Sequence, residues 1–149
     1  AYEITTRLVG SEMCIRDSVH RKYIEEVGSM NVMFKVGGKI ITPQLTGSVL
    51  PGITRRSCLE LLRDWGYAVE ERLITARELF DAADSGKLEE AWGTGTAAVI
   101  SPIGEMGWEG RHVVVNGGEI GSLTHKLYDT LVGIQWGTEP DPYGWTIQL

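Results

Sequence analysis

The chain has 149 residues, 42% of them hydrophobic, and a formal net charge of −6 at pH 7. This composition suits one globular domain with a buried core, and the acidic balance argues against nucleic acid as a partner. No apolar run approaches the roughly 20 residues of a membrane span, so we expect no membrane insertion. The cysteines and histidines lack the spacing of a metal site or a disulfide framework, so we expect no metal and a cytoplasmic location.

The first part of the chain predicts a hairpin, a helix and a strand. Two apolar runs in residues 31–42 flank a Gly-Gly pair, the pattern of a β-hairpin with a two-residue turn. Apolar residues then recur at helical spacing over residues 53–65, and Gly66 follows as a stop signal. Residues 69–74 form a short strand candidate.

A second helix and a buried strand are predicted in the middle of the chain. Thr75 and Glu78 have the spacing of a capping box, which opens a helix that stops at Gly86. A turn rich in Gly and Thr is predicted at residues 93–96. The apolar run at residues 97–102 reads as a buried strand closed by proline.

The last third predicts another strand, a turn and a long helix. Residues 111–115 are predicted as a strand, residues 116–118 as a turn, and a helical pattern runs over residues 121–136. Residues 141–145 are expected to be an ordered end with packed aromatics. Mixed strands and helices with short connections predict an α/β or α+β domain built around a sheet or partial barrel.

The strongest local signal is the turn before the first helix. Gly52 is expected to let the backbone turn tightly and approach a ligand closely. The amides of Ile53 and Thr54 are unpaired donors of the first helical turn, where the helix dipole favours an anion, and Thr54 adds a hydroxyl. The alternative is an ordinary helix start that Thr54 and water satisfy.

Two more segments could contribute to a site. Glu26 lies just before a glycine and a strand, although a glutamate in such a place is commonly solvated. Residues 93–98 combine small residues, which expose backbone amides, with hydroxyls that donate hydrogen bonds. By itself, each segment is more typical of an ordinary turn than of a binding site.

Together, in this order and spacing, the three segments resemble the carboxy-terminal part of the branched-chain amino-acid aminotransferases, which are pyridoxal-phosphate enzymes of fold type IV. The resemblance rests on Glu-Val-Gly-Ser-Met-Asn, Leu-Pro-Gly-Ile-Thr-Arg and Gly-Thr-Gly-Thr-Ala-Ala, and on the ending at residues 126–137. It covers nearly all of residues 20–149. It implies a large cofactor-binding domain in which helices flank a sheet or pseudo-barrel.

The resemblance also implies roles for individual residues. Glu26 would face the pyridine nitrogen of pyridoxal 5'-phosphate and keep the ring protonated. The backbone amides of Ile53 and Thr54, with the hydroxyls of Thr54 and Thr96, would hold the cofactor phosphate. The amides of Thr96 and Ala97 would bind the α-carboxylate of the substrate.

The family's Schiff-base lysine and its small amino-terminal domain have no match in this chain, so we assign no catalytic residue and expect the chain alone to be inactive. The implied parent enzyme moves the amino group of leucine, isoleucine or valine to 2-oxoglutarate and forms a homodimer or a higher homo-oligomer. One alternative keeps the fold, as a D-amino-acid transaminase or an aminodeoxychorismate lyase. Another is a non-enzymatic domain that binds a phosphate compound, although GxxxxGK[ST] and GxGxxG are absent.

Residues 8–18 resemble something else, the conceptual translation of a transposon-type sequencing adapter. They show no clear helical or strand period and no turn that joins them to the next segment. We therefore expect residues 1–18, Cys14 included, not to be native, and residues 19–149 to be the domain fragment.

Overall fold

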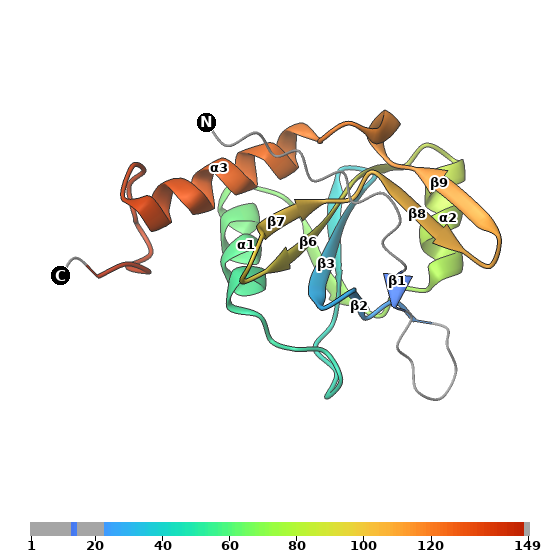
Figure 1. The fold of residues 1–149 in the computed structure, drawn as a ribbon, viewed down its shortest axis with the longest axis horizontal. Helices are drawn as coiled ribbons and strands as arrows, with labels where there is room; N and C mark the ends of the chain where they lie inside the picture. Colours follow the sequence, from blue (N-terminus) through green and yellow to red (C-terminus); the bar gives the residue numbers. More distant parts are fainter. Residues whose placement is uncertain (1–12, 15–22, 148–149) are drawn as a thin grey trace.

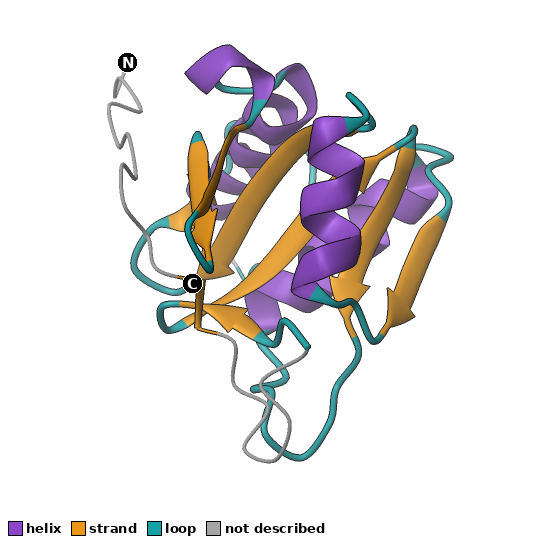
Figure 2. Ribbon diagram, turned by 90° about the vertical axis from the view of Figure 1, so that its right-hand side faces the viewer, coloured by secondary structure: helices purple, strands orange, loops and turns teal. Residues whose placement is uncertain are grey.

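A mixed β-sheet with helices on both of its faces forms the centre of the molecule (Figures 1 and 2). The computed structural model describes residues 13–14 and 23–147. Most of the segment expected not to be native therefore lies outside the described residues. The α/β expectation, a sheet flanked by helices, is confirmed.

The main sheet has seven strands, and β3 lies at its centre. On one side β3 pairs with β2 near its start and with β4 near its end, and on the other side it pairs with β6. All pairings are antiparallel except that of β4 with β5. The strands are β1 (Met13–Cys14), β2 (Glu26–Val27), β3 (Met30–Val36), β4 (Lys39–Pro43), β5 (Val69–Arg72), β6 (Leu88–Gly95) and β7 (Val99–Pro102).

A separate hairpin, β8 (Glu105–Trp108) with β9 (Arg111–Val114), packs beside α2. The β9 strand agrees with the prediction, whereas β8 and β2 were not predicted from the sequence. The predicted β3–β4 hairpin is also present, and Gly37 and Gly38 form its turn with φ angles of +55° and +78°. Such left-handed angles suit glycine, which has no Cβ to clash.

Three α-helices form where the pattern of apolar residues predicts them. They are α1 (Ile53–Asp64), α2 (Ala76–Asp84) and α3 (Ser122–Trp136). Thr75 caps α2 as expected, because its hydroxyl accepts a hydrogen bond from the amide of Glu78 at 3.0 Å. Within the described part of the chain, no helix combines the length and apolar character needed to cross a bilayer.

Apolar side chains form a separate core on each face of the sheet, because successive residues of a strand point to opposite faces. In β3, Val32 and Phe34 join the core beneath α2 and the β8–β9 hairpin, whereas Met33 joins the core beneath α1 and α3. The predicted packing of the carboxy-terminal aromatics is confirmed, since the rings of Tyr143 and Trp145 stack at 4.2 Å between centroids. Both rings pack against the second core.

The boundaries predicted after β6 are wrong, and the strand predicted at residues 69–74 ends at Arg72. The turn expected at residues 93–96 lies instead at residues 96–98, and β6 continues through Gly95. The expected strand at 97–102 begins only at Val99, so Ala97 lies in an exposed turn. The glycines suit the strand because Met30 of β3 fills the space where their side chains would stand.

Candidate functional site

Three polar residues form a row across the sheet, on the face that carries α1. Glu26 of β2 lies opposite Asn31 of β3, and Asn31 lies opposite Thr94 of β6. Their strand neighbours Val27 and Val32 point into the core on the other face. By the alternation of strand side chains, the row therefore faces the side on which α1 packs.

The row is joined to the segment that precedes α1. The carboxylate Oε1 of Glu26 accepts a hydrogen bond from the amide of Leu50 at 3.2 Å, and Nδ2 of Asn31 donates to the carbonyl of Leu50 at 2.8 Å. Nearby, Oε1 of Glu25 accepts from Oγ of Ser48 at 2.7 Å. The structure thus brings Glu26 and the start of α1, which are predicted site elements, to the same end of the sheet.

The reason for glycine at position 52 differs from the prediction. Gly52 has φ −63° and ψ 137°, an extended conformation open to any residue, so a tight turn does not require it. A Cβ at Gly52 would instead collide with Oδ1 of Asn31. The backbone approaches the Asn31 side chain closely, and this contact demands the glycine.

The start of α1 presents open donors. Gly52 is the N-cap and provides no side-chain cap, and the first bond of the helix runs from the amide of Arg56 to the carbonyl of Gly52 at 3.0 Å. The amides of Ile53 and Thr54 precede that bond and have no carbonyl within the helix to bond. Ile53 is 76% exposed and Thr54 is half-buried, so the first turn of α1 lies at the surface.

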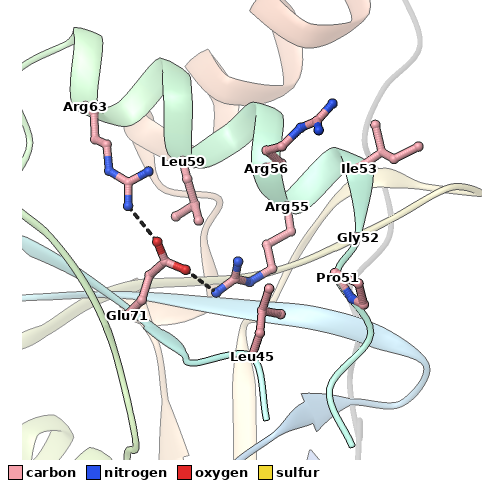
Figure 3. A pocket seen from close by; sticks show the side chains of 9 residues that line it. All are labelled: Leu45, Pro51, Gly52, Ile53, Arg55, Arg56, Leu59, Arg63 and Glu71. Carbon is pink, nitrogen blue, oxygen red and sulfur yellow. Dashed lines mark hydrogen bonds and ion pairs between the residues drawn. The ribbon is translucent and has the colours of Figure 1, made fainter. Parts of the chain in front are cut away.

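Arg55 fastens the first turn of α1 to β4 and β5. Its side chain is 5% exposed, and its guanidinium donates through Nη2 to the carbonyl of Pro43 at 3.0 Å and to Glu71 at 2.9 Å. Arg63 donates to the other oxygen of Glu71 at 2.7 Å (Figure 3). Burial alone would raise the pKa of Glu71, but the hydrogen bonds from Arg63 and Arg55 outweigh burial and lower it. The carboxylate therefore stays charged between the two arginines.

A hollow of about 310 Å³ lies beside the start of α1 (Figure 3). Three arginines and one glutamate give its lining an excess of positive charge. Glu26, Thr54, Thr96 and Ala97 are not part of that lining, so the hollow adjoins the predicted cofactor residues and does not enclose them. The lining residues are Leu45, Pro51, Gly52, Ile53, Arg55, Arg56, Leu59, Arg63 and Glu71.

Thr96 and Ala97 lie in the exposed turn between β6 and β7. This turn begins at Thr96, two positions after Thr94 of the row. Thr94 is 2% exposed, and its Oγ1 has no hydrogen-bond partner among the described residues. After the turn, Val99 has φ +57°, an unfavourable left-handed angle for a β-branched residue. Such strain is often found at functional turns.

Asn31 and Arg55 were not singled out from the sequence. Both are buried polar residues, and each bonds a backbone carbonyl at least 12 positions away in the chain, so no local pattern reveals their partners. A weak signal existed for Asn31, since asparagine is depleted in strands and yet stands here at the start of an apolar run.

The donors and the carboxylate select for a particular kind of ligand. The amides at the start of α1 favour an anion, and the hydroxyl of the exposed Thr96 can donate to one. Glu26 would repel that same anion and instead favours a protonated nitrogen. A compound with a phosphate and a basic nitrogen, such as pyridoxal phosphate, would need these two kinds of group. In residues 13–14 and 23–147, no group of three or more His, Cys, Asp or Glu could hold a metal ion.

Residues 19–106 match the family described as amino-transferase class IV. A protein of Staphylococcus epidermidis named "Probable branched-chain-amino-acid aminotransferase" is 54% identical over 133 residues, which are 89% of this chain and 37% of that protein. "Branched-chain-amino-acid aminotransferase 2" of Bacillus subtilis is 52% identical over 139 residues, 93% of this chain and 38% of that protein. The chain thus spans well under half the length of the relatives it matches.

Solved structures agree with the sequence relatives. The branched-chain amino acid aminotransferase of Escherichia coli superposes with a TM-score of 0.71 at 30% identity, over 85% of this chain and 39% of that one. The T.th. enzyme of the same name, complexed with N-(5'-phosphopyridoxyl)-L-glutamate, gives a TM-score of 0.69 at 27% identity, over 83% of this chain and 38% of that one.

Proposed function

Because the chain belongs to the class IV aminotransferases, we propose that it forms the cofactor-binding part of a pyridoxal-phosphate-dependent branched-chain amino-acid transaminase. The parent enzyme would move the amino group of leucine, isoleucine or valine to 2-oxoglutarate. The names of the relatives support this substrate class. A homo-oligomeric state and a cytoplasmic location belong to the same proposal.

The observation that carries the proposal is the link between Glu26 and the start of α1 through Leu50. In this proposal the amides of Ile53 and Thr54 hold the phosphate of pyridoxal 5'-phosphate, and the Thr96 hydroxyl adds a third donor. Glu26 accepts a hydrogen bond from the pyridine N–H and keeps that nitrogen protonated. When bound, the cofactor supplies an electron-poor ring that accepts the electron pair released as the substrate loses its α-proton.

The exposed turn at Thr96 and Ala97 would bind the substrate. Its backbone amides would donate to the α-carboxylate, a second anion held by main-chain donors. Since Thr96 would also contact the phosphate, one turn would set the distance between substrate and cofactor. The Ala97 side chain is a single methyl group in an exposed position, which leaves room for a ligand at the turn.

Recovery of the full-length gene, followed by an assay of the expressed enzyme, tests the function. We expect transamination of leucine, isoleucine and valine with 2-oxoglutarate, and a strong loss of activity in Glu26→Gln with little change in stability. Preferential turnover of a D-amino acid, or release of a lyase product, would instead favour the same-fold alternatives. An enzyme with no amino-group transfer would refute the proposal.

We also propose that residues 1–18 are not native to this protein. Their resemblance to translated adapter sequence supports this, and the family match begins at residue 19, whereas the alignment with the Bacillus subtilis relative covers 139 of the 149 residues and so includes part of this segment. Sequencing of the source DNA across the junction tests it. Adapter-free DNA that encodes another family segment in place of these residues is expected, whereas the same 18 codons in native DNA would refute it.

A further inference from the structure

We propose that Asn31 is a positioning residue that holds the phosphate-binding start of α1 at a set distance from the carboxylate of Glu26. The inference rests on the proposed function, since it assigns the amides of Ile53 and Thr54 to a phosphate. Asn31 itself need not touch the ligand. It would act through the backbone of residues 50–52.

Both the amide and the carbonyl of Leu50 are hydrogen-bonded to residues of the sheet. The amide of Leu50 donates to Glu26 at 3.2 Å, while its carbonyl accepts from Nδ2 of Asn31 at 2.8 Å. The same carbonyl accepts from the amide of Gly52 at 2.8 Å, which closes a three-residue turn around Pro51. Asn31 therefore bonds the atom that defines the turn directly before α1.

The other side of the Asn31 amide group contacts Gly52. Its Oδ1 lies against the α-carbon of Gly52, so closely that a Cβ on Gly52 would collide with it. Asn31 is only 6% exposed and belongs to the central strand of the sheet, so it has little freedom to move away. One side chain thus sets both the position of the Leu50 carbonyl and the position of the N-cap of α1.

The consequence is a fixed geometry for the two ligand-binding groups. Glu26 lies opposite Asn31 across the β2–β3 pairing, and Gly52 lies against Asn31. A rigid compound that reaches both the α1 amides and Glu26 needs that spacing in place before it binds. Removal of the Asn31 amide should therefore weaken binding of a ligand that has a phosphate, and should leave a phosphate-free analogue unaffected.

Amide NMR titrations of the 149-residue chain test this without any need for activity. The probes are pyridoxamine 5'-phosphate and pyridoxamine, and the signals to follow are the amides of Ile53 and Thr54. In Asn31→Ala we expect about five-fold weaker binding of the phosphate compound, the effect of roughly one net hydrogen bond, and unchanged binding of pyridoxamine. Asn31→Leu, which keeps the side-chain volume, should show the same loss.

Thr42→Val is the matched control. Thr42 is also buried and donates to a backbone carbonyl, that of Val32 at 2.7 Å, but it lies in β4 away from the turn. This variant should lose a comparable hydrogen bond and retain the affinity of the wild type for both probes. An equal loss of phosphate affinity in Thr42→Val would mean that general destabilisation causes the effect, and would overturn the positioning role.

A double-mutant cycle tests the contact with Gly52 directly. Gly52→Ala should weaken phosphate binding in the wild type, because the new methyl group displaces Asn31, and should be much less harmful in the Asn31→Ala background. Additive effects would overturn the inference. If the Ile53 and Thr54 amides of the wild type do not respond to the phosphate compound, the phosphate site of the proposed function fails. If they respond equally in wild type and Asn31→Ala, only the role of Asn31 fails.

Discussion

Glu90 is a buried carboxylate of β6 that holds the start of α3, and its removal is the most informative perturbation of stability. Oε1 accepts from the amide of Leu123 at 3.1 Å, and Oε2 accepts from the amide and the hydroxyl of Thr124 at 2.8 Å and 2.7 Å. Gly121, the N-cap, has no side chain to fill this role, and a Cβ there would collide with the carboxylate. Glu90 thus supplies the missing cap of α3 from a distant strand.

Glu90→Ala would leave three buried donors without their acceptor. Each unsatisfied buried donor costs about 1–3 kcal/mol. Because water can enter the space left behind and satisfy part of the donors, we expect the free energy of unfolding to fall by about 3–5 kcal/mol, less than three full penalties. That is a large fraction of the roughly 5–15 kcal/mol that stabilise a typical domain. Glu90→Gln keeps one acceptor oxygen and should cost about 1–2 kcal/mol.

Urea unfolding of the chain, followed by tryptophan fluorescence and circular dichroism, measures these differences. The control is Glu89→Ala at the neighbouring position, where the side chain is 37% exposed, forms an ion pair with Lys35 at 2.7 Å and accepts a hydrogen bond from the amide of Gly38 at 2.6 Å. Because water can reach these partly exposed groups when the carboxylate is removed, we expect a smaller loss there, of about 1 kcal/mol. Equal losses in the two alanine variants would show that Glu90 does not act as the cap of α3.

Three further outcomes are expected. The hydrogen bond to Asp64 at 2.6 Å raises the pKa of Tyr143 to about 12. An ultraviolet titration should therefore show the phenol ionising at unusually high pH, and Asp64→Asn should lower its pKa. The contribution of this hydrogen bond to the stability of the fold is present below about pH 10 and is lost as the pH rises through about 12. Burial would raise the pKa of Glu71, but the hydrogen bonds from Arg63 and Arg55 lower it. The charged Glu71 therefore stabilises the fold at neutral pH, and this contribution is lost as the pH falls through the lowered pKa. An acid unfolding curve that is unchanged in Glu71→Gln would contradict this. The 149-residue chain alone should not transaminate leucine in an amino-transfer assay, and measurable turnover would show that the absent lysine is not needed.

Elements defined by neighbouring residues were predictable. The Gly-Gly hairpin, the helix that starts at Ile53 and the Thr75 cap depend on contacts over a few residues, and the structure has all three. The end of β6 was not predictable, because its glycines signalled a turn. Only the packing of Met30 against Gly93 and Gly95 shows why a strand tolerates them.

The candidate site divides in the same way. Glu26, Ile53, Thr54, Thr96 and Ala97 came from short motifs, and their roles toward a cofactor stay predictions. Asn31 and Arg55 emerged only with the fold, and the reason assigned to Gly52 changed from a tight turn to the close approach of Asn31.

The sequence by itself therefore determined that a helix begins at Ile53 and the family to which its motifs point. Helix starts and short motifs are properties of consecutive residues, and these can be read without knowing which residues lie across the sheet. Only the tertiary structure decided that Glu26, Asn31 and Thr94 share one row and that this row holds the start of α1. The physical reason is that strand register and side-chain packing bring together residues that are far apart in the chain. Which residues become neighbours is decided only when the strands pair and the helices pack against the sheet.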